Sequence, residues 1–251
     1  MWTYLLAAGL SLVIGVVLGM LGGGGAILTL PMLVYAVGVE PKAAIASSLF
    51  VVGATSAVGT AVNARSRTVE WRIGLAFGAA AMGGAFAGGR LAAFVPASLL
   101  LVGFALMMLV TAAAMLRGRA EPPAGATSGP FPLGRMLALG AGVGVVSGLV
   151  GAGGGFLIVP ALSLVGGLPL KRAIATSLFV IALQSFAGFA GHIGHAALDA
   201  PLLALVTIAA MVGLLAGLRV GKRLPAQHLR RGFAWLVIAM GLFVLAKQVA
   251  L

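Results

Sequence analysis

The chain has 251 residues, of which 61% are hydrophobic and 8% are charged, and its formal net charge is +12. A soluble domain has roughly a quarter of its residues charged, so this composition excludes a water-soluble globular protein and indicates one embedded in lipid. The absence of cysteine excludes disulfides, thiolate metal sites and cysteine nucleophiles. The lysines and arginines stand in short clusters between apolar runs, which is typical of residues that set membrane topology and not of nucleic-acid binding.

Apolar runs follow one another along the whole chain. They cover residues 4–21, 26–38, 42–63, 71–91 and 97–116, and then 133–150, 155–167, 171–191, 200–218 and 229–250. Most have the ~17–25 residues with which a helix crosses a bilayer. Runs 26–38 and 155–167 would form only ~20 Å of helix, so we predict half-helices there. The first run lacks a basic start and a clear cleavage site, so we expect a membrane segment and not a cleaved signal.

The second half of the chain repeats the first. The string GMLGGGGAILTLP at residues 19–31 returns as GLVGAGGGFLIVP at residues 148–160, and KAAIASSLFV at residues 42–51 returns as KRAIATSLFV at residues 171–180. Every match has the same offset of 129 residues. We therefore predict an all-α polytopic membrane protein with a first repeat over residues 1–120, a linker over 121–132 and a second repeat over 133–251. The two repeats form one integrated transmembrane domain.

The basic residues predict how these segments cross the membrane. If three long segments of each half span, and each glycine-broken pair enters and leaves on one side, only Lys42, Arg90 and Lys247 are extracytoplasmic. The other thirteen of the 16 lysines and arginines are then cytoplasmic, as the positive-inside rule requires. This arrangement inverts one half relative to the other, whereas a parallel duplication fits the charges badly. We predict a multi-pass protein of the inner (cytoplasmic) membrane with both termini extracytoplasmic.

The two glycine clusters are the candidate substrate site. A glycine run breaks a helix, and broken backbone at membrane depth is tolerated only where protein or a water-filled cavity surrounds it. We expect the half-helices to begin near Ala26 and Phe156, where unpaired N–H groups and the helix dipole favour an anion. Two such ends in inverted halves would point at a common site. The candidates are Gly22, Gly23, Gly24, Gly25, Ala26, Gly151, Gly153, Gly154, Gly155 and Phe156.

Close packing is the alternative role of these glycines. The spacing of four residues between Gly15, Gly19 and Gly23, and between Gly140, Gly144 and Gly148, is typical of helix contacts. It explains those rows but not the contiguous glycines.

Polar residues near the clusters are further candidates. Hydroxyls of the matched pairs Ser47, Ser48 and Thr176, Ser177 either donate to an oxyanion or bond back to their own helix. Ser56 and Ser185 also match. Gln184, which replaces Thr55, contacts either ligand or another helix.

Weaker candidates lie outside this set. Lys42 and Lys171 either attract an anion or snorkel to headgroups. Pro31 and Pro160 can kink the half-helices. His192 is a candidate proton sensor near the outer end of a span. Glu70 and Asp199 are matched acids at helix starts, where we expect them to cap.

The doubled motifs around residues 19–31 and 44–50 resemble the sulfite exporter TauE/SafE family of membrane permeases, and the resemblance covers essentially the whole chain. It implies secondary transport of sulfite, sulfoacetate, other organosulfonates or related small organic anions. The chain departs from strict repeat symmetry at Gly23/Ala152, Ala26/Gly155 and Thr55/Gln184.

We therefore expect a secondary transporter of a small sulfur-containing oxyanion, with export as its direction and alternating access as its mechanism. We expect no catalytic residue, metal or cofactor, and no nucleotide cradle is found in the sequence. The partners expected are the anionic substrate, the lipid bilayer and a coupling proton or other ion; an oligomer is compatible with the sequence. The alternatives are an anion channel, a permease for another small organic anion, and a non-transporting scaffold subunit.

Overall fold

The structure is a computed structural model that describes residues 2–21, 27–117, 133–151, 154–164, 166–193, 196, 198–221 and 226–249. The described residues form helices and no strand. The first half contains α1 (Trp2–Leu21), α2 (Thr29–Pro31), the π-helical turn η2 (Met32–Val37), α3 (Pro41–Arg65), α4 (Trp71–Leu91), the 3₁₀ turn η3 (Ala92–Phe94) and α5 (Ala97–Leu116). The second half contains α6 (Leu133–Val150), α7 (Gly155–Leu164), α8 (Leu170–His192), α9 (Ala200–Val220) and α10 (Ala226–Val249).

The predicted membrane segments are confirmed as helices. In the described part of the chain, α1, α3, α6, α8 and α9 are long and apolar enough to cross a bilayer. In the apolar 18-residue stretch of each helix, 67% of the residues of α3 and 61% of those of α8 are buried. The corresponding share is 33–39% for α1, α6 and α9. The helices α3 and α8 are therefore the centre of the bundle, and the others present apolar side chains to lipid.

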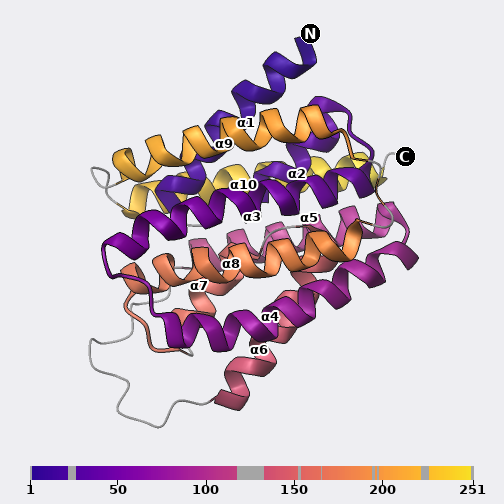
Figure 1. The fold of residues 1–251 in the computed structure, drawn as a ribbon. Helices are drawn as coiled ribbons and strands as arrows, with labels where there is room; N and C mark the ends of the chain where they lie inside the picture. The colour runs from indigo at the N-terminus through magenta and orange to yellow at the C-terminus, as the bar shows by residue number, and fades with distance from the viewer. Residues whose placement is uncertain are drawn as a thin grey trace.

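The two central helices pack antiparallel (Figure 1). A Cβ added at Gly188 of α8 would lie 3.3 Å from Leu49 Cδ1, and one added at Gly59 of α3 would lie 3.1 Å from Leu178 Cδ1. Leu178 and Gly188 are the residues 129 positions after Leu49 and Gly59. One contact is thus the other with the two halves exchanged.

Each half packs its third long helix onto the other half. Helix α9 lies along α1, where a Cβ at Gly15 would collide with the Ala210 carbonyl oxygen. Helix α4 lies along α6, where a Cβ at Gly144 would collide with the Ala81 carbonyl oxygen. These residues are again 129 positions apart. The glycine rows of α1 and α6 are therefore close helix contacts, as their spacing predicts.

Contacts between neighbouring helices fix their directions. In four pairs of neighbouring helices, the residue numbers of the contacting residues increase in both helices, so the two helices of each pair are parallel. These pairs are α1 with α9, α3 with α9, α4 with α6, and α4 with α8. We call the end of the bundle at which α1 begins and α10 ends the terminal end; there α1, α3, α5 and α9 begin and α4, α8 and α10 end (Figure 1). We call the opposite end, which carries Arg65, Arg72 and Arg172, the basic end. There α4, α6, α8 and α10 begin and α3, α5 and α9 end. Because α1 and α3 are parallel, the chain between them doubles back, and the same holds between α6 and α8.

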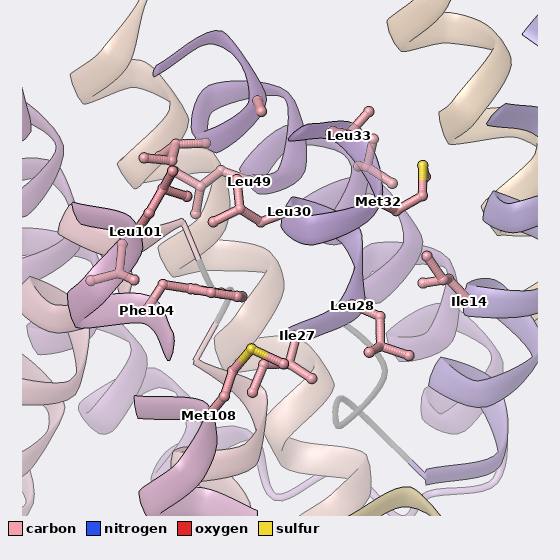
Figure 2. Packing of buried hydrophobic residues seen from close by; sticks show 14 of the residues in the cluster. Ile14, Ile27, Leu28, Leu30, Met32, Leu33, Leu49, Leu101, Phe104 and Met108 are labelled. Carbon is pink, nitrogen blue, oxygen red and sulfur yellow. The ribbon is translucent and has the colours of Figure 1, made fainter. Parts of the chain in front are cut away.

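The short segment that returns from α1 to α3 is enclosed by protein. Residues 27–33 are all buried. Figure 2 shows this segment among side chains of α1, α3 and α5, with Ile27 beside Met108 and Leu30 beside Leu49. Irregular backbone is thereby kept from lipid, as the membrane requires.

Candidate functional site

The second glycine cluster breaks the chain between α6 and α7. Gly151 has a φ of +74° and Gly154 a φ of +62°, a backbone region that residues with side chains rarely adopt. Helix α7 begins at Gly155, one residue before the predicted start. A Cβ at Gly151 would lie 2.8 Å from Ile45 Cγ2, and one at Gly154 would collide with Gln184 Nε2. Glycine is therefore required at these positions for two reasons: the backbone conformation, and the close approach of the backbone to α3 and α8.

Three polar side chains surround this break. Ser48 Oγ lies 2.8 Å from both the Ile45 and the Gly151 carbonyl oxygens, and its hydroxyl can donate to either. Gln184 Nε2 donates to Ser147 Oγ at 3.3 Å. Ser48, Ser147 and Gln184 are fully buried. The structure thus brings Ser48, Gly151, Gly154 and Gln184 together from three segments that the sequence predicted as separate candidates.

Ser147 is a polar neighbour of the site that the sequence analysis missed. It lies within the glycine row of α6, one residue before Gly148, where the spacing of the glycines predicts helix packing. The available signal was a hydroxyl between contact glycines, three residues before the end of α6.

Other predicted site residues are only partly covered. Gly22, Gly23, Gly24, Gly25, Ala26 and Gly153 lie outside the described residues, as does the predicted linker. Phe156 and Pro160 lie within α7, and Lys171 lies in the first turn of α8. Ser177 bonds back to the Ile174 carbonyl at 2.8 Å, as its repeat equivalent Ser48 does to Ile45.

Thr176 belongs to a corner at the basic end of the bundle. The Glu70 backbone N–H donates to Thr176 Oγ1 at 3.0 Å, and the Glu70 carboxylate forms an ion pair with Arg172. Glu70 precedes α4, but its side chain does not cap that helix. The capping expectation was therefore wrong for Glu70, because the guanidinium of Arg172 holds the carboxylate away from the first turn. We name Glu70, Arg172 and Thr176 the basic-end corner.

The equivalent corner at the terminal end is arranged differently. Ser47, Ala43 and Asp199 are the repeat equivalents of Thr176, Arg172 and Glu70. No hydrogen bond joins Ser47 to Asp199 among the described residues. Instead both line a small pocket with room for about one water molecule, whose other walls are Leu33, Val39, Val51, Leu202, Leu203 and Val206. Asp199 does cap its helix, since Oδ1 accepts from the Leu202 N–H at 3.0 Å.

The weaker candidates lie away from the glycine cluster. Lys42 Nζ donates to the Ala93 carbonyl at 3.1 Å, which ties the start of α3 to the turn η3 that follows α4. Pro31 ends the short α2 and η2 follows it, so the helix changes its winding there. His192 is the last residue of α8 and is buried, with Nδ1 3.0 Å from the Gly188 carbonyl oxygen.

Among the described residues, hydrogen-bonding groups and no buried cation surround the break. Backbone N–H groups at the start of α7, the Ser48 hydroxyl and the Gln184 amide all lie at or beside the break. The positive end of a helix dipole adds to them, and together these groups suit an anion with several oxygens. The described residues contain no cluster of histidine, aspartate and glutamate that could hold a metal ion.

Comparison with known proteins gives the same functional class. The family described as "Sulfite exporter TauE/SafE" matches residues 7–244. A probable membrane transporter protein of Xylella fastidiosa is 32% identical over 240 residues, which covers 94% of this chain and 92% of that protein. The probable membrane transporter protein YunE of Bacillus subtilis is 31% identical over 211 residues, covering 74% and 77%. No solved structure matches the chain significantly.

Proposed function

Because the chain belongs to the sulfite exporter TauE/SafE family, whose relatives are named as membrane transporters, we propose that it carries a small sulfur-containing oxyanion by alternating access. The candidate substrates are sulfite, sulfoacetate and other organosulfonates, and export is the proposed direction. The chain is a multi-pass membrane transporter and not an enzyme. Substrate, direction and mechanism are the proposed part.

The observation that carries the proposal is the buried break before α7. Gly154 packs against Gln184 and Ser147, and Ser48 reaches Gly151 from the other half of the chain. Burying a polar group in a membrane protein costs free energy unless the group makes a hydrogen bond, and such groups often mark substrate pathways. Sulfite and sulfonates spread negative charge over several oxygens, so backbone N–H groups and neutral side chains can hold them.

We propose that the two halves are inverted repeats. The exchanged contacts Leu49 with Gly188 and Leu178 with Gly59 support a two-fold relation between antiparallel α3 and α8. Transporters of this kind bind substrate near the repeat interface, beside broken helices. The cluster at residues 22–25 is then the second half of the anion site.

The distribution of charge supports an orientation in the inner membrane. The described basic side chains at the terminal end are Lys42, Arg90 and Lys247, whereas those at the basic end are Arg65, Arg67, Arg72, Arg117, Arg135, Arg172 and Arg219. The positive-inside rule places the basic end in the cytoplasm. Both termini are then extracytoplasmic.

The two corners support alternating access. Equivalent residues are joined by a hydrogen bond and an ion pair at the basic end, and are separated by a pocket at the terminal end. A transporter that alternates between two states closes one end while it opens the other. We propose that the basic-end corner is the cytoplasmic gate, closed in this structure, and that Ser47 and Asp199 form the opposite gate.

Flux through the reconstituted protein tests the substrate class. We expect proteoliposomes to show saturable flux of radiolabelled sulfite or of an organosulfonate such as sulfoacetate, with chloride as the comparison anion. Inside-out and right-side-out vesicles, each with and without a pH gradient, separate export from import and test coupling to protons. Absence of flux and of binding for every sulfur oxyanion would refute the proposal.

A further inference from the structure

Two buried hydroxyls in the centre of the bundle make no hydrogen bond with the residues that the structure describes. Ser56 lies in α3 and Ser185 in α8, 129 positions later. Both residues are 0% exposed. Neither Oγ atom has a hydrogen-bond partner among the described residues. The same defect thus occurs at both copies of one position.

Other hydroxyls of this protein avoid the defect by bonding back to their own helix. Thr55, beside Ser56, donates to the Val51 carbonyl at 2.7 Å, and Thr60, one turn later, donates to the Ser56 carbonyl at 2.8 Å. Ser11, Ser48, Thr111, Ser177 and Thr207 also reach a carbonyl three or four residues earlier. Such bonds are the usual solution for a helical serine or threonine. Leaving a buried hydroxyl unpaired costs free energy, so two equivalent exceptions require a reason.

Their position gives that reason. The contacts of Leu49 with Gly188 and of Gly59 with Leu178 bracket both serines, so Ser56 and Ser185 lie where the central helices cross. Ser185 directly follows Gln184, whose amide reaches the glycine break at Gly154. Both serines therefore lie on the interface between the two halves, and Ser185 is next in the chain to a residue of the proposed anion site.

We propose that Ser56 and Ser185 are substrate-contacting residues whose hydroxyls donate to oxygens of the transported anion as it crosses the centre of the bundle. The inference rests on the proposed function. A sulfur oxyanion offers several acceptor oxygens, so it can take a proton donor from each half at once. Because the two serines are equivalent in the two repeats, the same pair of hydroxyls can contact the anion whichever side of the membrane the site faces.

Replacement of the serines by alanine separates this role from packing. We expect Ser56→Ala and Ser185→Ala each to raise the transport KM, and the double variant to raise it by about tenfold or more, since a hydrogen bond to a charged group is lost. The melting temperature should stay equal or rise, because alanine removes an unpaired buried hydroxyl. Thr60→Val is the matched control, whose hydroxyl is bonded within α3, and it should keep the wild-type KM.

The assay uses the full chain in proteoliposomes, with the sulfur oxyanion that the wild type carries and melting measured in the same detergent. An unchanged KM in the double variant, with normal wild-type flux, would overturn this inference and leave the proposed function standing. A lowered melting temperature with an unchanged KM would assign the serines to packing and would also overturn it. Wild-type protein that carries no sulfur oxyanion would overturn both.

Discussion

At the scale of single residues, the break before α7 depends on glycine. Gly154 combines a left-handed backbone with a side-chain direction that Gln184 already occupies. Gly142, twelve positions earlier in α6, has helical backbone and no atom within 4 Å of an added Cβ. The same substitution at these two glycines therefore has opposite consequences.

Gly154→Ala should destabilise the protein and weaken anion binding. Left-handed backbone costs alanine about 1–2 kcal/mol, and displacement of Gln184 adds to that cost. Gly142→Ala should instead stabilise by about 0.5–1 kcal/mol, because it lowers the entropy of the unfolded helix segment. Thermal unfolding in detergent, with and without the transported anion, measures both effects. Equal melting temperatures for the two variants would show that the break is not held as described.

The sequence predicted the residues of the site better than their partners. Gly151, Gly154, Ser48 and Gln184 were candidates because contiguous glycines and matched hydroxyls are unusual in apolar spans. That Ser48 reaches the opposite repeat, 103 positions away, depends on tertiary packing that no local pattern encodes. The role of Glu70 was predicted wrongly because a helix-start acid has a local partner, whereas its actual partner Arg172 lies in the other half.

At the scale of elements, the basic-end corner joins α8 to the start of α4. Arg172 has no repeat equivalent, since residue 43 is alanine, and the ion pair therefore exists at one end only. In the proposed transport cycle, this difference favours the state in which the basic end is closed. A partly exposed ion pair contributes about 0–1 kcal/mol, which corresponds to a shift of up to about fivefold between two states.

Arg172→Ala should shift the protein toward the state that is open at the basic end. In a Ser47→Cys background, we expect a membrane-impermeant maleimide applied at the terminal end to react up to about fivefold more slowly. Arg117→Ala removes another exposed guanidinium at the basic end and is the control. A labelling rate that is unchanged by Arg172→Ala would refute the gate.

Glycine contacts between α1 and α9 set the distance between these helices. A Cβ at Gly15 would collide with the Ala210 backbone, which cannot move without separating the helices. Gly15→Val should therefore lower the yield of folded protein or its melting temperature by a cost of at least about 1–3 kcal/mol. Gly9→Val lies in the same helix with open space and should be tolerated. Size-exclusion chromatography and thermal unfolding compare the two, and similar behaviour would contradict the packing.

At the scale of the whole molecule, two similar sequence repeats form one bundle in which each half packs on the other. Helix α4 packs on α6 and α8, and α9 packs on α1 and α3, so each repeat completes the other. The repeat and the spans were predictable because apolar length and the offset of 129 are properties of the sequence. The packing of α4 on α6 and of α9 on α1 was not predictable from the sequence. Both α4 and α9 carry small residues, and a surface of small residues can pack against the first helix of either half.

The proposed inversion predicts on which side of the membrane two loops lie. Ser66 follows α3 at the basic end, and Ala196 lies between α8 and α9 at the terminal end. With no native cysteine, single Ser66→Cys and Ala196→Cys variants can be labelled without background. We expect an impermeant maleimide to label position 66 only from the cytoplasmic side and position 196 only from the outside. Labelling of both from one side would contradict the inversion.

The central claim is that an anion is carried by a site that opens to one side at a time, and counterflow tests it most directly. Proteoliposomes loaded with unlabelled substrate and placed in a trace of labelled substrate should accumulate label transiently above its equilibrium level. The overshoot should be reduced in Gly154→Ala and retained in Gly142→Ala. A labelled anion that only equilibrates, without saturation or overshoot, would show a channel and contradict alternating access.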